Sequence, residues 1–528
     1  MIPDAPILSI RDLTVALPAG SDRPFAVEAA SFDLGRSEIL CVVGESGSGK
    51  SVLSAAVLGA LPHPLAIDRG RILFDGENVS GLPQAGWRNL RGRRIAAIPQ
   101  EPMAALNPTM RVGRQIEEMF AIHTRLDREQ RRIEALMLIE EMHLPNPPQI
   151  AQRFPHELSG GQCQRICIAM ALALRPDVLI ADEPTTALDV TTQAKVLGLI
   201  RELRQRHGLA VLFITHDLGV AAELADKVGV MERGFMVEQG PAAQVLNEPS
   251  HPYTRALIAA APTLDIGSRA RSSAETSSTP CLEAVGLTKF HGSRQTLKPT
   301  DLTIDRATTL ALVGESGSGK TTLARLLAGM TRPTAGHATV DGVDLARLVG
   351  RRLSRSRRAV QMIFQDPLGS LNPRRAVGAV VARAAVLAGD DRAGARVRAR
   401  QLLRRVGLGD DAYDRRPSAF SGGQRQRIGI ARAVALQPAL LIADECVSAL
   451  DVLVQRQILD LLDELRTEFG LTVLFITHDL RVAAQVSDTL AVMQAGQIVE
   501  LADTTAVLNR PRHAYTKALL AAVPRLNR

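Results

Sequence analysis

Two stretches of the chain have the composition and spacing of a phosphate-binding loop. They read Gly44, Glu45, Ser46, Gly47, Ser48, Gly49, Lys50, Ser51 and Gly314, Glu315, Ser316, Gly317, Ser318, Gly319, Lys320, Thr321. In such a loop the glycines let successive backbone N–H groups wrap around phosphates, and the following helix adds the positive end of its dipole. The lysine reaches the β- and γ-phosphates, and the last hydroxyl ligates Mg²⁺. The sequence therefore predicts two sites for a nucleoside triphosphate with Mg²⁺.

Each loop needs a strand before it and a helix after it, because these elements hold the loop and point the helix start at the phosphates. Apolar runs at 39–43 and 309–313 come directly before the two loops, and apolar residues in a helical pattern follow at 52–61 and 323–330. This context favours nucleotide binding over a chance occurrence of the motif.

An acidic pair follows a short apolar run in each half of the chain. The pairs are Asp182 with Glu183 and Asp444 with Glu445. A carboxylate at the end of a buried strand is held rigidly, so we expect the aspartate of each pair to bind Mg²⁺ through water. The adjacent glutamate is the candidate general base that orients the attacking water. The alternative, an acidic pair on the surface, is disfavoured by the apolar strand that leads into it.

The motifs recur at long separation, which indicates two copies of one domain rather than a solenoid of repeats of about 20–50 residues. We expect a first α/β domain over residues 1–262 and a second over 281–528. Residues 263–280, which are rich in Ser, Thr, Ala and Pro, are predicted to form a flexible linker.

Each half presents further motifs in a fixed order, and together they resemble those of the ATP-binding cassette (ABC) ATPases. After the phosphate loop come a glutamine, a serine-glycine-glycine-glutamine signature, the acidic pair, an Ala-Leu-Asp triplet and a histidine. In the first half these are Gln100, Ser159, Gly160, Gly161, Gln162, Asp182, Glu183, Ala187, Leu188, Asp189 and His216; in the second they are Gln365, Ser421, Gly422, Gly423, Gln424, Asp444, Glu445, Ala449, Leu450, Asp451 and His478. The resemblance implies two tandem cassettes, each with a RecA-like core, an antiparallel β subdomain and a helical subdomain bearing the signature.

The resemblance also implies roles for these residues. Gln100 and Gln365 would sense Mg²⁺ and the attacking water, and the two histidines would contact the γ-phosphate. A lone histidine is more often structural, but its place after an apolar strand in both copies favours the functional role. The signature serines are natural helix N-caps, and in the family the signature covers the phosphate that the opposite domain binds. Each ATP pocket would therefore be shared between the two halves.

The chain departs from the family pattern in two places. The family usually has an aromatic residue upstream of the phosphate loop that stacks on adenine. In the second half this position falls at Phe290 or His291, whereas residues 13–17 of the first half contain no aromatic residue. Cys446 stands where Pro184 stands in the first copy.

Composition limits the function classes. No run of 18 or more apolar residues occurs, so membrane domains of a transporter would be separate proteins. The amino terminus does not have the pattern of a secretory signal, and the odd number of five cysteines has no disulfide-like spacing, so we expect a cytosolic protein. We expect no iron–sulfur cluster.

The chain is basic, with a formal net charge of +8, which raises the question of nucleic acid. Aromatic residues for base stacking make up only 3% of the chain, so we expect no nucleic-acid partner. Two arginine-rich runs stand at the same place in each copy, and we interpret them as a solvated face, with contact to the anionic inner leaflet of the membrane as the alternative. They comprise Arg88, Arg91, Arg93, Arg94 and Arg351, Arg352, Arg355, Arg357, Arg358.

Several phrases resemble, more narrowly, the ATPases of bacterial peptide and nickel importers. They are 100–103 with 106–108, 365–367 with 371–373, and His251-Pro252-Tyr253-Thr254 with its echo His513-Ala514-Tyr515-Thr516. An ordinary terminal helix cap is the alternative interpretation of the tyrosine phrase.

This narrower resemblance implies an ATP-hydrolysing motor, peripheral on the cytoplasmic face of the bacterial inner membrane. Two integral-membrane permease subunits would be its direct partners, and an extracytoplasmic substrate-binding protein would act indirectly. Peptides or peptide-like compounds are the expected cargo, with nickel or another small solute as an alternative. A soluble tandem-cassette ATPase acting on ribosomes or DNA is the other alternative. It is disfavoured because neither a long charged helical linker nor paired zinc-binding cysteines stand between the halves.

Overall fold

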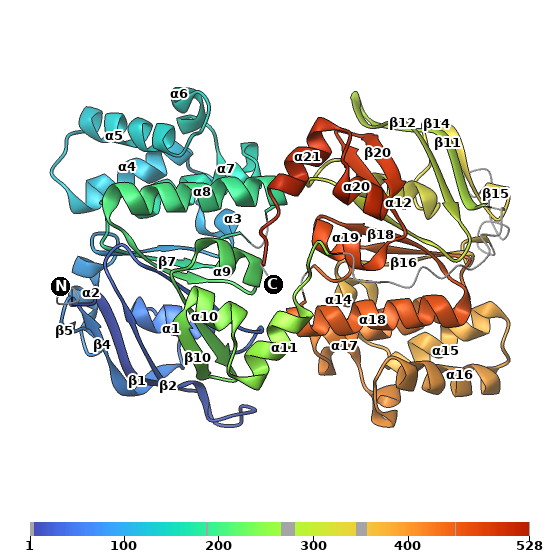
Figure 1. The fold of residues 1–528 in the computed structure, drawn as a ribbon, viewed down its shortest axis with the longest axis horizontal. Helices are drawn as coiled ribbons and strands as arrows, with labels where there is room; N and C mark the ends of the chain where they lie inside the picture. Colours follow the sequence, from blue (N-terminus) through green and yellow to red (C-terminus); the bar gives the residue numbers. More distant parts are fainter. Residues whose placement is uncertain (1–4, 186–187, 266–279, 345–355, 449, 527–528) are drawn as a thin grey trace. The chain divides into compact units, whose positions relative to one another are not determined.

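The computed structural model comprises two compact units, which divide in the sequence between Ala261 and Pro262, and the order of elements is repeated from one to the other (Figure 1). The structure describes residues 5–185, 188–265, 280–344, 356–448 and 450–526. Most of the predicted linker therefore lies outside the described residues, as do Ala187, Ala449, Arg351, Arg352 and Arg355.

A six-stranded sheet forms the core of each unit. Its order is β10-β9-β3-β8-β7-β6 in the first unit and β20-β19-β13-β18-β17-β16 in the second. The first sheet contains β3 (Ile39–Val43), β6 (Ile95–Ile98), β7 (Val178–Asp182), β8 (Ala210–Ile214), β9 (Lys227–Glu232) and β10 (Phe235–Pro241). The second contains β13 (Thr309–Val313), β16 (Val360–Ile363), β17 (Leu440–Asp444), β18 (Thr472–Thr477), β19 (Thr489–Gln494) and β20 (Gln497–Asp503). Five strands run parallel, and only β10 and β20 pair antiparallel with their neighbours.

The parallel strands are buried because helices cover both faces of such a sheet. Every residue of β3, β8, β13 and β18 is buried, which explains the continuous apolar runs in the sequence. The helices around the first core are α1 (Lys50–Val57), α8 (Val190–His207), α9 (Leu218–Leu224), α10 (Ala242–Asn247) and α11 (Pro252–Ala260). Their counterparts in the second unit are α12 (Lys320–Leu327), α18 (Val452–Phe469), α19 (Leu480–Val486), α20 (Thr504–Asn509) and α21 (Ala514–Ala521).

A four-stranded antiparallel sheet packs on each core. It consists of β1 (Leu8–Ala16), β2 (Phe25–Leu34), β4 (Ala66–Phe74) and β5 (Glu77–Asn78) in the first unit, and of β11 (Pro280–His291), β12 (Arg294–Asp305), β14 (Ala335–Val340) and β15 (Val343–Asp344) in the second. From Thr300 to Asp305, buried and exposed residues of β12 alternate, as a half-buried strand requires. Side chains of both sheets and of α1, including Leu13, Val42 and Leu53, share one apolar core.

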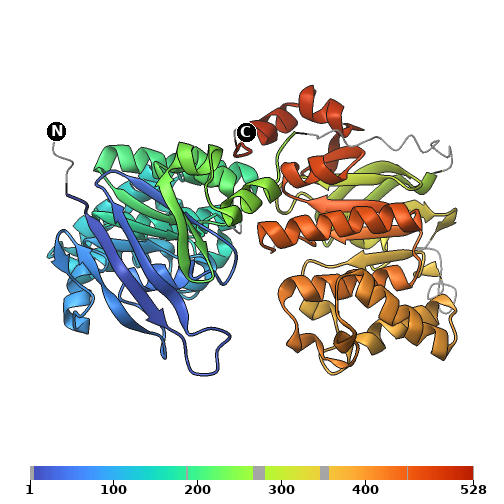
Figure 2. The ribbon, with the colours of Figure 1, turned by 60° about the horizontal axis from the view of Figure 1, so that its bottom comes forward.

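A group of helices forms the third part of each unit. The first unit has α3 (Pro102–Ala105), α4 (Val112–His123), α5 (Arg128–Glu141), α6 (Pro147–Ala151) and α7 (Gly160–Leu172), and the second has α14 (Pro367–Ser370), α15 (Val377–Ala388), α16 (Arg392–Arg405) and α17 (Gly422–Ala435). Helix α2 (Gln84–Leu90) lies outside this group, because its buried Trp87 belongs to the apolar core of the antiparallel sheet. In the second unit, α15 and α16 lie on the opposite side of the core sheet from β11, β12 and β14 (Figure 2). These three parts confirm the predicted α/β class with an antiparallel β subdomain and a helical subdomain. Among the described residues, no helix combines the length and the apolar character needed to cross a membrane.

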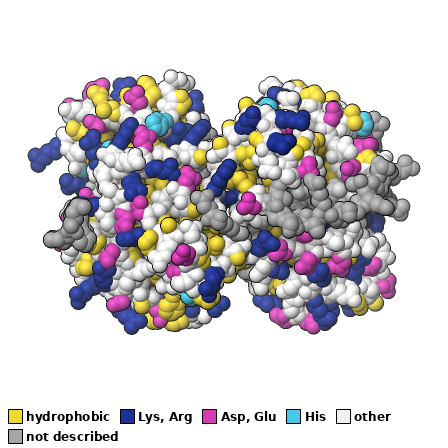
Figure 3. Space-filling model, viewed as in Figure 1, with side chains coloured by type: hydrophobic (Ala, Val, Ile, Leu, Met, Phe, Trp, Pro, Cys, Tyr) yellow, Lys and Arg dark blue, Asp and Glu magenta, His cyan; other side chains and the backbone are white. Residues whose placement is uncertain are grey.

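The arginine-rich runs are engaged in contacts within their own units. Arg94 pairs with Asp177 at 2.8 Å and with Asp75 at 3.0 Å, and Arg91 donates to the carbonyl of Leu58 at 2.7 Å. In the second unit Arg357 donates to the carbonyl of Gly329 at 2.9 Å. On the face seen in Figure 3, Lys and Arg side chains are interspersed with Asp and Glu. These arginines therefore hold loops as well as contributing positive charge.

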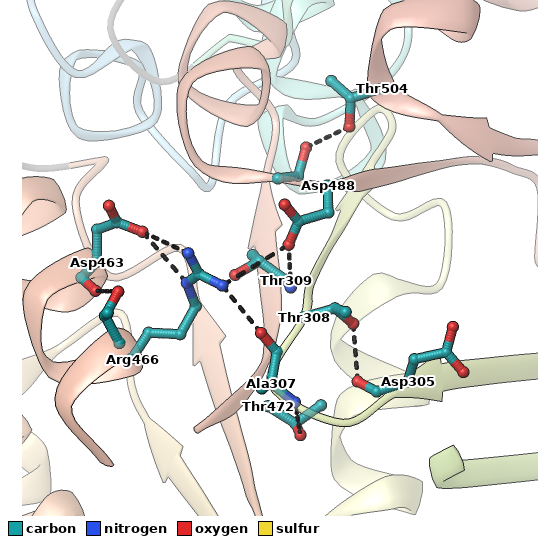
Figure 4. A network of polar contacts seen from close by, with 11 residues as sticks. Asp305, Ala307, Thr308, Thr309, Asp463, Arg466, Thr472, Asp488 and Thr504 are labelled. Carbon is teal, nitrogen blue, oxygen red and sulfur yellow. Dashed lines mark hydrogen bonds and ion pairs between the residues drawn. The ribbon is translucent and has the colours of Figure 1, made fainter. Parts of the chain in front are cut away.

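The strand that leads to the phosphate loop is anchored at its other end. In the second unit Asp488 accepts a hydrogen bond from the backbone N–H of Thr309 at 2.8 Å, and Arg466 donates to the carbonyl of Ala307 at 2.9 Å (Figure 4). The first unit repeats this arrangement with Asp226 and Arg204, which contact Ile39 N–H at 2.8 Å and the carbonyl of Ser37 at 2.6 Å. In both units, an aspartate and an arginine thus fix the start of the strand that leads to the phosphate loop.

We predict that Asp488→Ala destabilises the second unit by about 1–3 kcal/mol, because it leaves the N–H of Thr309, a residue only 3% exposed, without this acceptor. Urea unfolding measures the loss of stability, and hydrogen exchange of the β13 amides shows whether the loss is felt at this strand. Asp460→Ala is the control, because Asp460 pairs with Arg456 in an exposed ion pair worth about 0–1 kcal/mol. Equal effects of the two substitutions would contradict the anchoring role.

Candidate nucleotide-binding sites

The phosphate loop of each unit closes around the ammonium group of its own lysine. Lys50 Nζ lies 2.8 Å from the carbonyl oxygens of both Gly44 and Glu45. Lys320 Nζ repeats this at 2.8 and 2.9 Å from the carbonyls of Gly314 and Glu315. Both lysine residues are only 4% exposed. The loop is therefore already folded around a buried positive charge, next to the start of α1 or α12.

The glycines at the loop boundaries are required by both conformation and space. Gly44 has φ 153°, and a Cβ there would lie 2.2 Å from the carbonyl oxygen of Met231. Gly49 has φ 108°, and a Cβ would lie 2.3 Å from the carbonyl oxygen of Ala26. Only glycine adopts these conformations at no steric cost. The loop can thus pass close to β2 and to the end of β9.

The aspartate at the end of each acidic-pair strand lies against the start of the loop helix. In the first unit Asp182 accepts hydrogen bonds from Ser51 Oγ and Ser54 Oγ, both at 3.2 Å. Burial raises its pKa, although the two hydroxyls act in the opposite direction. In the second unit burial, reinforced by the charge of Glu445, raises the pKa of Asp444 to about 6.

These oxygens fit Mg²⁺. The buried Oδ1 of Asp444 has no hydrogen-bond partner among the described residues. A bound cation would satisfy this oxygen. Within the described ranges no group of three or more His, Cys, Asp or Glu side chains is placed to hold a metal. The site is therefore no complete protein cage, and Mg²⁺ would need phosphate oxygens and water to fill its coordination.

The glutamate of the acidic pair meets the predicted glutamine and histidine. Glu183 Oε2 accepts from Gln100 Nε2 at 3.2 Å and lies 3.3 Å from His216 Nδ1. In the second unit the corresponding distances are 3.2 Å from Gln365 to Glu445 and 3.7 Å from His478 to Glu445. Sequence reasoning predicted these residues separately, and the structure brings them together in both units.

The backbone and the protonation of this cluster are also unusual. Glu183 and Glu445 have φ 47° and 46°, a conformation that is uncommon for residues other than glycine and that concentrates at functional sites. Burial acts to lower the pKa of His216 and His478, but the hydrogen bond and charge of the neighbouring glutamate raise it overall. A carboxylate aimed by two side chains from separate elements is suited to orient a water molecule.

Each signature begins a helix, as predicted. Ser159 Oγ accepts from the N–H of Gln162 at 3.3 Å, and Gln162 Oε1 accepts from the N–H of Ser159 at 3.0 Å, which completes a capping box. Ser421 and Gln424 form the same box at the same distances. Both serines are exposed, so the positive end of each helix dipole faces solvent and can bind an anion.

The region upstream of the loops differs between the units. In the second unit Phe290 is 41% exposed at the end of β11. In the first unit β1 ends at Ala16, and Arg23 from the following loop donates a hydrogen bond to the carbonyl of Gly47.

Cys446 is 3% exposed, and burial raises the pKa of its thiol to about 12, so it is an inert packing residue.

Several contacts at the loops were missed by sequence reasoning. Ser54 adds a second hydroxyl to Asp182, and Arg23 reaches Gly47. The hydroxyl of Tyr253 accepts a hydrogen bond from the N–H of Glu45, and that of Tyr515 accepts one from the N–H of Glu315. The echo of the tyrosine phrase was the only signal in the sequence that pointed to any of them.

Comparisons with known proteins agree with this geometry. The "ABC transporter" family matches residues 27–186 and 297–448, and "Oligopeptide/dipeptide transporter, C-terminal region" matches 237–286 and 499–528. Among similar proteins, the glutathione import ATP-binding protein GsiA of Pectobacterium atrosepticum is 42% identical over 99% of this chain and 90% of its own. The peptidoglycan transport ATP-binding protein YejF of Agrobacterium fabrum is 42% identical over 98% of this chain and 96% of its own.

Replacing the loop lysine tests the site. We predict that Lys50→Ala or Lys320→Ala lowers ATP affinity in its own pocket at least about tenfold, because a charge-assisted contact contributes roughly 1.5–3 kcal/mol. Calorimetric titration with ATP gives the affinities, and Lys195→Ala, an exposed position on α8, is the control. Unchanged affinity in both loop variants would defeat the assignment.

Proposed function

Because the chain belongs to the ABC transporter family and is an ATPase subunit with two cassettes, we propose that it is the motor of a bacterial importer of peptides or peptide-like compounds. The observation that carries the proposal is that, in both units, the glutamate of the acidic pair contacts the glutamine and the histidine at the carboxyl end of the sheet that also carries the phosphate loop. Relatives named for glutathione import and peptidoglycan transport, together with the oligopeptide/dipeptide match, support the cargo class. We assign the cassettes to residues 1–262 and 281–528, joined by a linker over 263–280.

The residues of each cassette divide the work of ATP hydrolysis. The lysine and the loop N–H groups bind the β- and γ-phosphates. Ser51 with Asp182, and Thr321 with Asp444, would hold Mg²⁺, which neutralises phosphate charge when bound. The glutamate accepts a proton from water as that water attacks the γ-phosphate and the bond from the γ-phosphorus to the bridging oxygen breaks, which leaves ADP. The glutamine and histidine hold the carboxylate in place. The contact of Ser51 with Asp182, and those of the glutamine and histidine with the glutamate, support this division.

We further propose that the two ATP pockets are shared between cassettes. Ser421, Gly422 and Gly423 would cover the phosphates bound at Lys50, and Ser159, Gly160 and Gly161 those bound at Lys320. The exposed, capped helix starts of α7 and α17 support this role, because such helix ends bind anions. ATP would then hold the cassettes together, and hydrolysis would release them.

The proposed partners are two integral-membrane permeases, which the motor drives from the cytoplasmic face of the membrane, and an external binding protein that delivers the cargo. The inner leaflet would be a secondary contact.

Loss of the gene should reduce uptake of labelled dipeptide or glutathione and leave Ni²⁺ uptake unchanged. The wild-type chain should restore uptake in the deletion strain, and the Glu183→Gln, Glu445→Gln double variant should not, since removing a positioned general base costs about 10²–10⁴ in rate. Lost Ni²⁺ uptake with intact peptide uptake would contradict the cargo class. Co-purification with ribosomal RNA instead of membrane proteins would contradict the importer.

The shared pockets have a reciprocal test. In a chain where Glu445→Gln leaves only the Glu183 pocket active, Ser421→Arg should abolish hydrolysis, because the arginine puts bulk where a phosphate must sit. In the Glu183→Gln background, Ser159→Arg should do the same to the Glu445 pocket. Steady-state ATPase rates measure both effects, and the opposite pairings serve as controls. If Ser421→Arg damages only the pocket that contains Glu445, the cassettes work as separate ATPases.

A further inference from the structure

The tyrosine phrases near the end of each unit form a built contact with the phosphate loop. The start of each phrase is hydrogen-bonded to a glutamate of the antiparallel strand at the edge of the core sheet. Glu238 on β10 accepts hydrogen bonds from the N–H and the hydroxyl of Ser250, both at 2.7 Å, and from the N–H of His251 at 3.1 Å. Glu500 on β20 accepts from the N–H groups of Arg512 and His513 at 2.8 and 3.1 Å. Burial opposes ionisation of Glu238, yet its hydrogen bonds lower the pKa to about 2, so the anchor is a carboxylate.

The histidine of each phrase then starts the terminal helix. His251 Nδ1 accepts from the N–H of Tyr253 at 3.2 Å, and His513 Nδ1 accepts from the N–H of Tyr515 at 3.2 Å. In the first unit the helix has proline at its first position, where the fixed φ is already helical. Capping the helix therefore explains why the phrase contains a histidine and, in the first unit, a proline. It does not explain the tyrosine.

The tyrosine hydroxyl reaches the loop instead. Tyr253 Oη accepts from the N–H of Glu45 at 3.2 Å, and Tyr515 Oη accepts from the N–H of Glu315 at 3.1 Å. The chain has three tyrosines, and two of them make this same contact. The third, Tyr413, lies in the helical subdomain with the guanidinium of Arg400 over its ring.

The peptide group that the tyrosine contacts is the one that holds the lysine. The N–H of Glu45 and the carbonyl of Gly44 belong to one peptide unit, and that carbonyl accepts from Lys50 Nζ at 2.8 Å. The plane of this peptide is therefore fixed on one side by Tyr253 and on the other by Lys50. In the second unit Tyr515 and Lys320 fix the peptide between Gly314 and Glu315 in the same way.

We propose that Tyr253 and Tyr515 are positioning residues for ATP binding, through which the terminal segment of each cassette holds the first peptide of the phosphate loop and hence the loop lysine. A hydroxyl that fixes this peptide keeps the loop in its phosphate-ready shape before ATP arrives, so less ordering is needed on binding. Changes in the terminal segment would then be felt as changes in ATP affinity. The inference rests on the proposed assignment of the phosphate loops as the ATP sites.

Tyrosine-to-phenylalanine variants test it, because they remove the hydroxyl and keep the ring. With Lys320→Ala restricting binding to the first site, Tyr253→Phe should raise the Kd for ATP about 2- to 10-fold, the effect of losing a neutral hydrogen bond. Tyr515→Phe should do the same in the Lys50→Ala background. In the otherwise unchanged chain, KM for ATP should rise by a similar factor while kcat stays within about twofold and the melting temperature falls by no more than about 2–4 °C.

The controls separate the positioning role of the tyrosines from the assignment of the phosphate loops as ATP sites. Tyr413→Phe should leave ATP affinity unchanged, and Glu238→Gln should weaken affinity only at the first site. If the lysine variants lose affinity and the Tyr253 and Tyr515 variants do not, the positioning role is overturned and the ATP sites stand. If neither set loses affinity, the site assignment itself fails. An equal loss for Tyr413→Phe would also overturn the role, since the effect would then not depend on contact with the loop.

Discussion

A buried ammonium group held by the carbonyls of its own loop is the interaction on which the rest of each unit depends. Lys50 and Lys320 are each only 4% exposed, and a buried charge is costly unless it is hydrogen-bonded. The loop satisfies it only if its first peptide is turned inward and its glycines adopt left-handed conformations close to β9 or β19. The loop shape, the lysine position and the neighbouring strands are therefore fixed together, before any phosphate binds.

Sheet order explains why the other site residues converge on this loop. The phosphate-loop strand pairs in parallel with β8 or β18 on one side, and that strand pairs in parallel with the strand of the acidic pair. Ligands bind at the carboxyl ends of such strands. Asp182 ends β7, Glu183 follows it directly and His216 follows the end of β8, so the topology brings distant parts of the sequence within hydrogen-bond reach. The anchors at the opposite edge, Asp226 and Asp488, keep the same strand from shifting along its axis.

The sequence predicted features whose physics is local. The loop glycines, the apolar strand runs and the capping serine of the signature each depend on a few neighbouring residues, and the structure places them where the patterns indicated. Helices α1 and α12 begin at the lysine itself, slightly before the apolar pattern that marked them. The subdomain division followed from family resemblance, because no local pattern encodes strand order. Contacts such as Ser54 to Asp182, Arg466 to Ala307 and Tyr253 to Glu45 join residues that only the tertiary fold brings together, so spacing could not predict them.

The two units differ upstream of the phosphate loop and beside the acidic pair, where Ser54 contacts Asp182 in the first unit and Ala324 is its counterpart in the second. The contacts of the loop lysine and of the glutamine with the glutamate keep nearly the same distances in both units, because a highly charged group must be met by donors in fixed positions. Upstream of the loop, one unit presents Phe290 and the other Arg23. An aromatic face and a planar guanidinium can both stack on a base, so this side tolerates a change in residue type that the phosphate side does not. The contacts of the lysine and of the glutamate, in which charge dictates geometry, are therefore the same in both units although neighbouring residues differ.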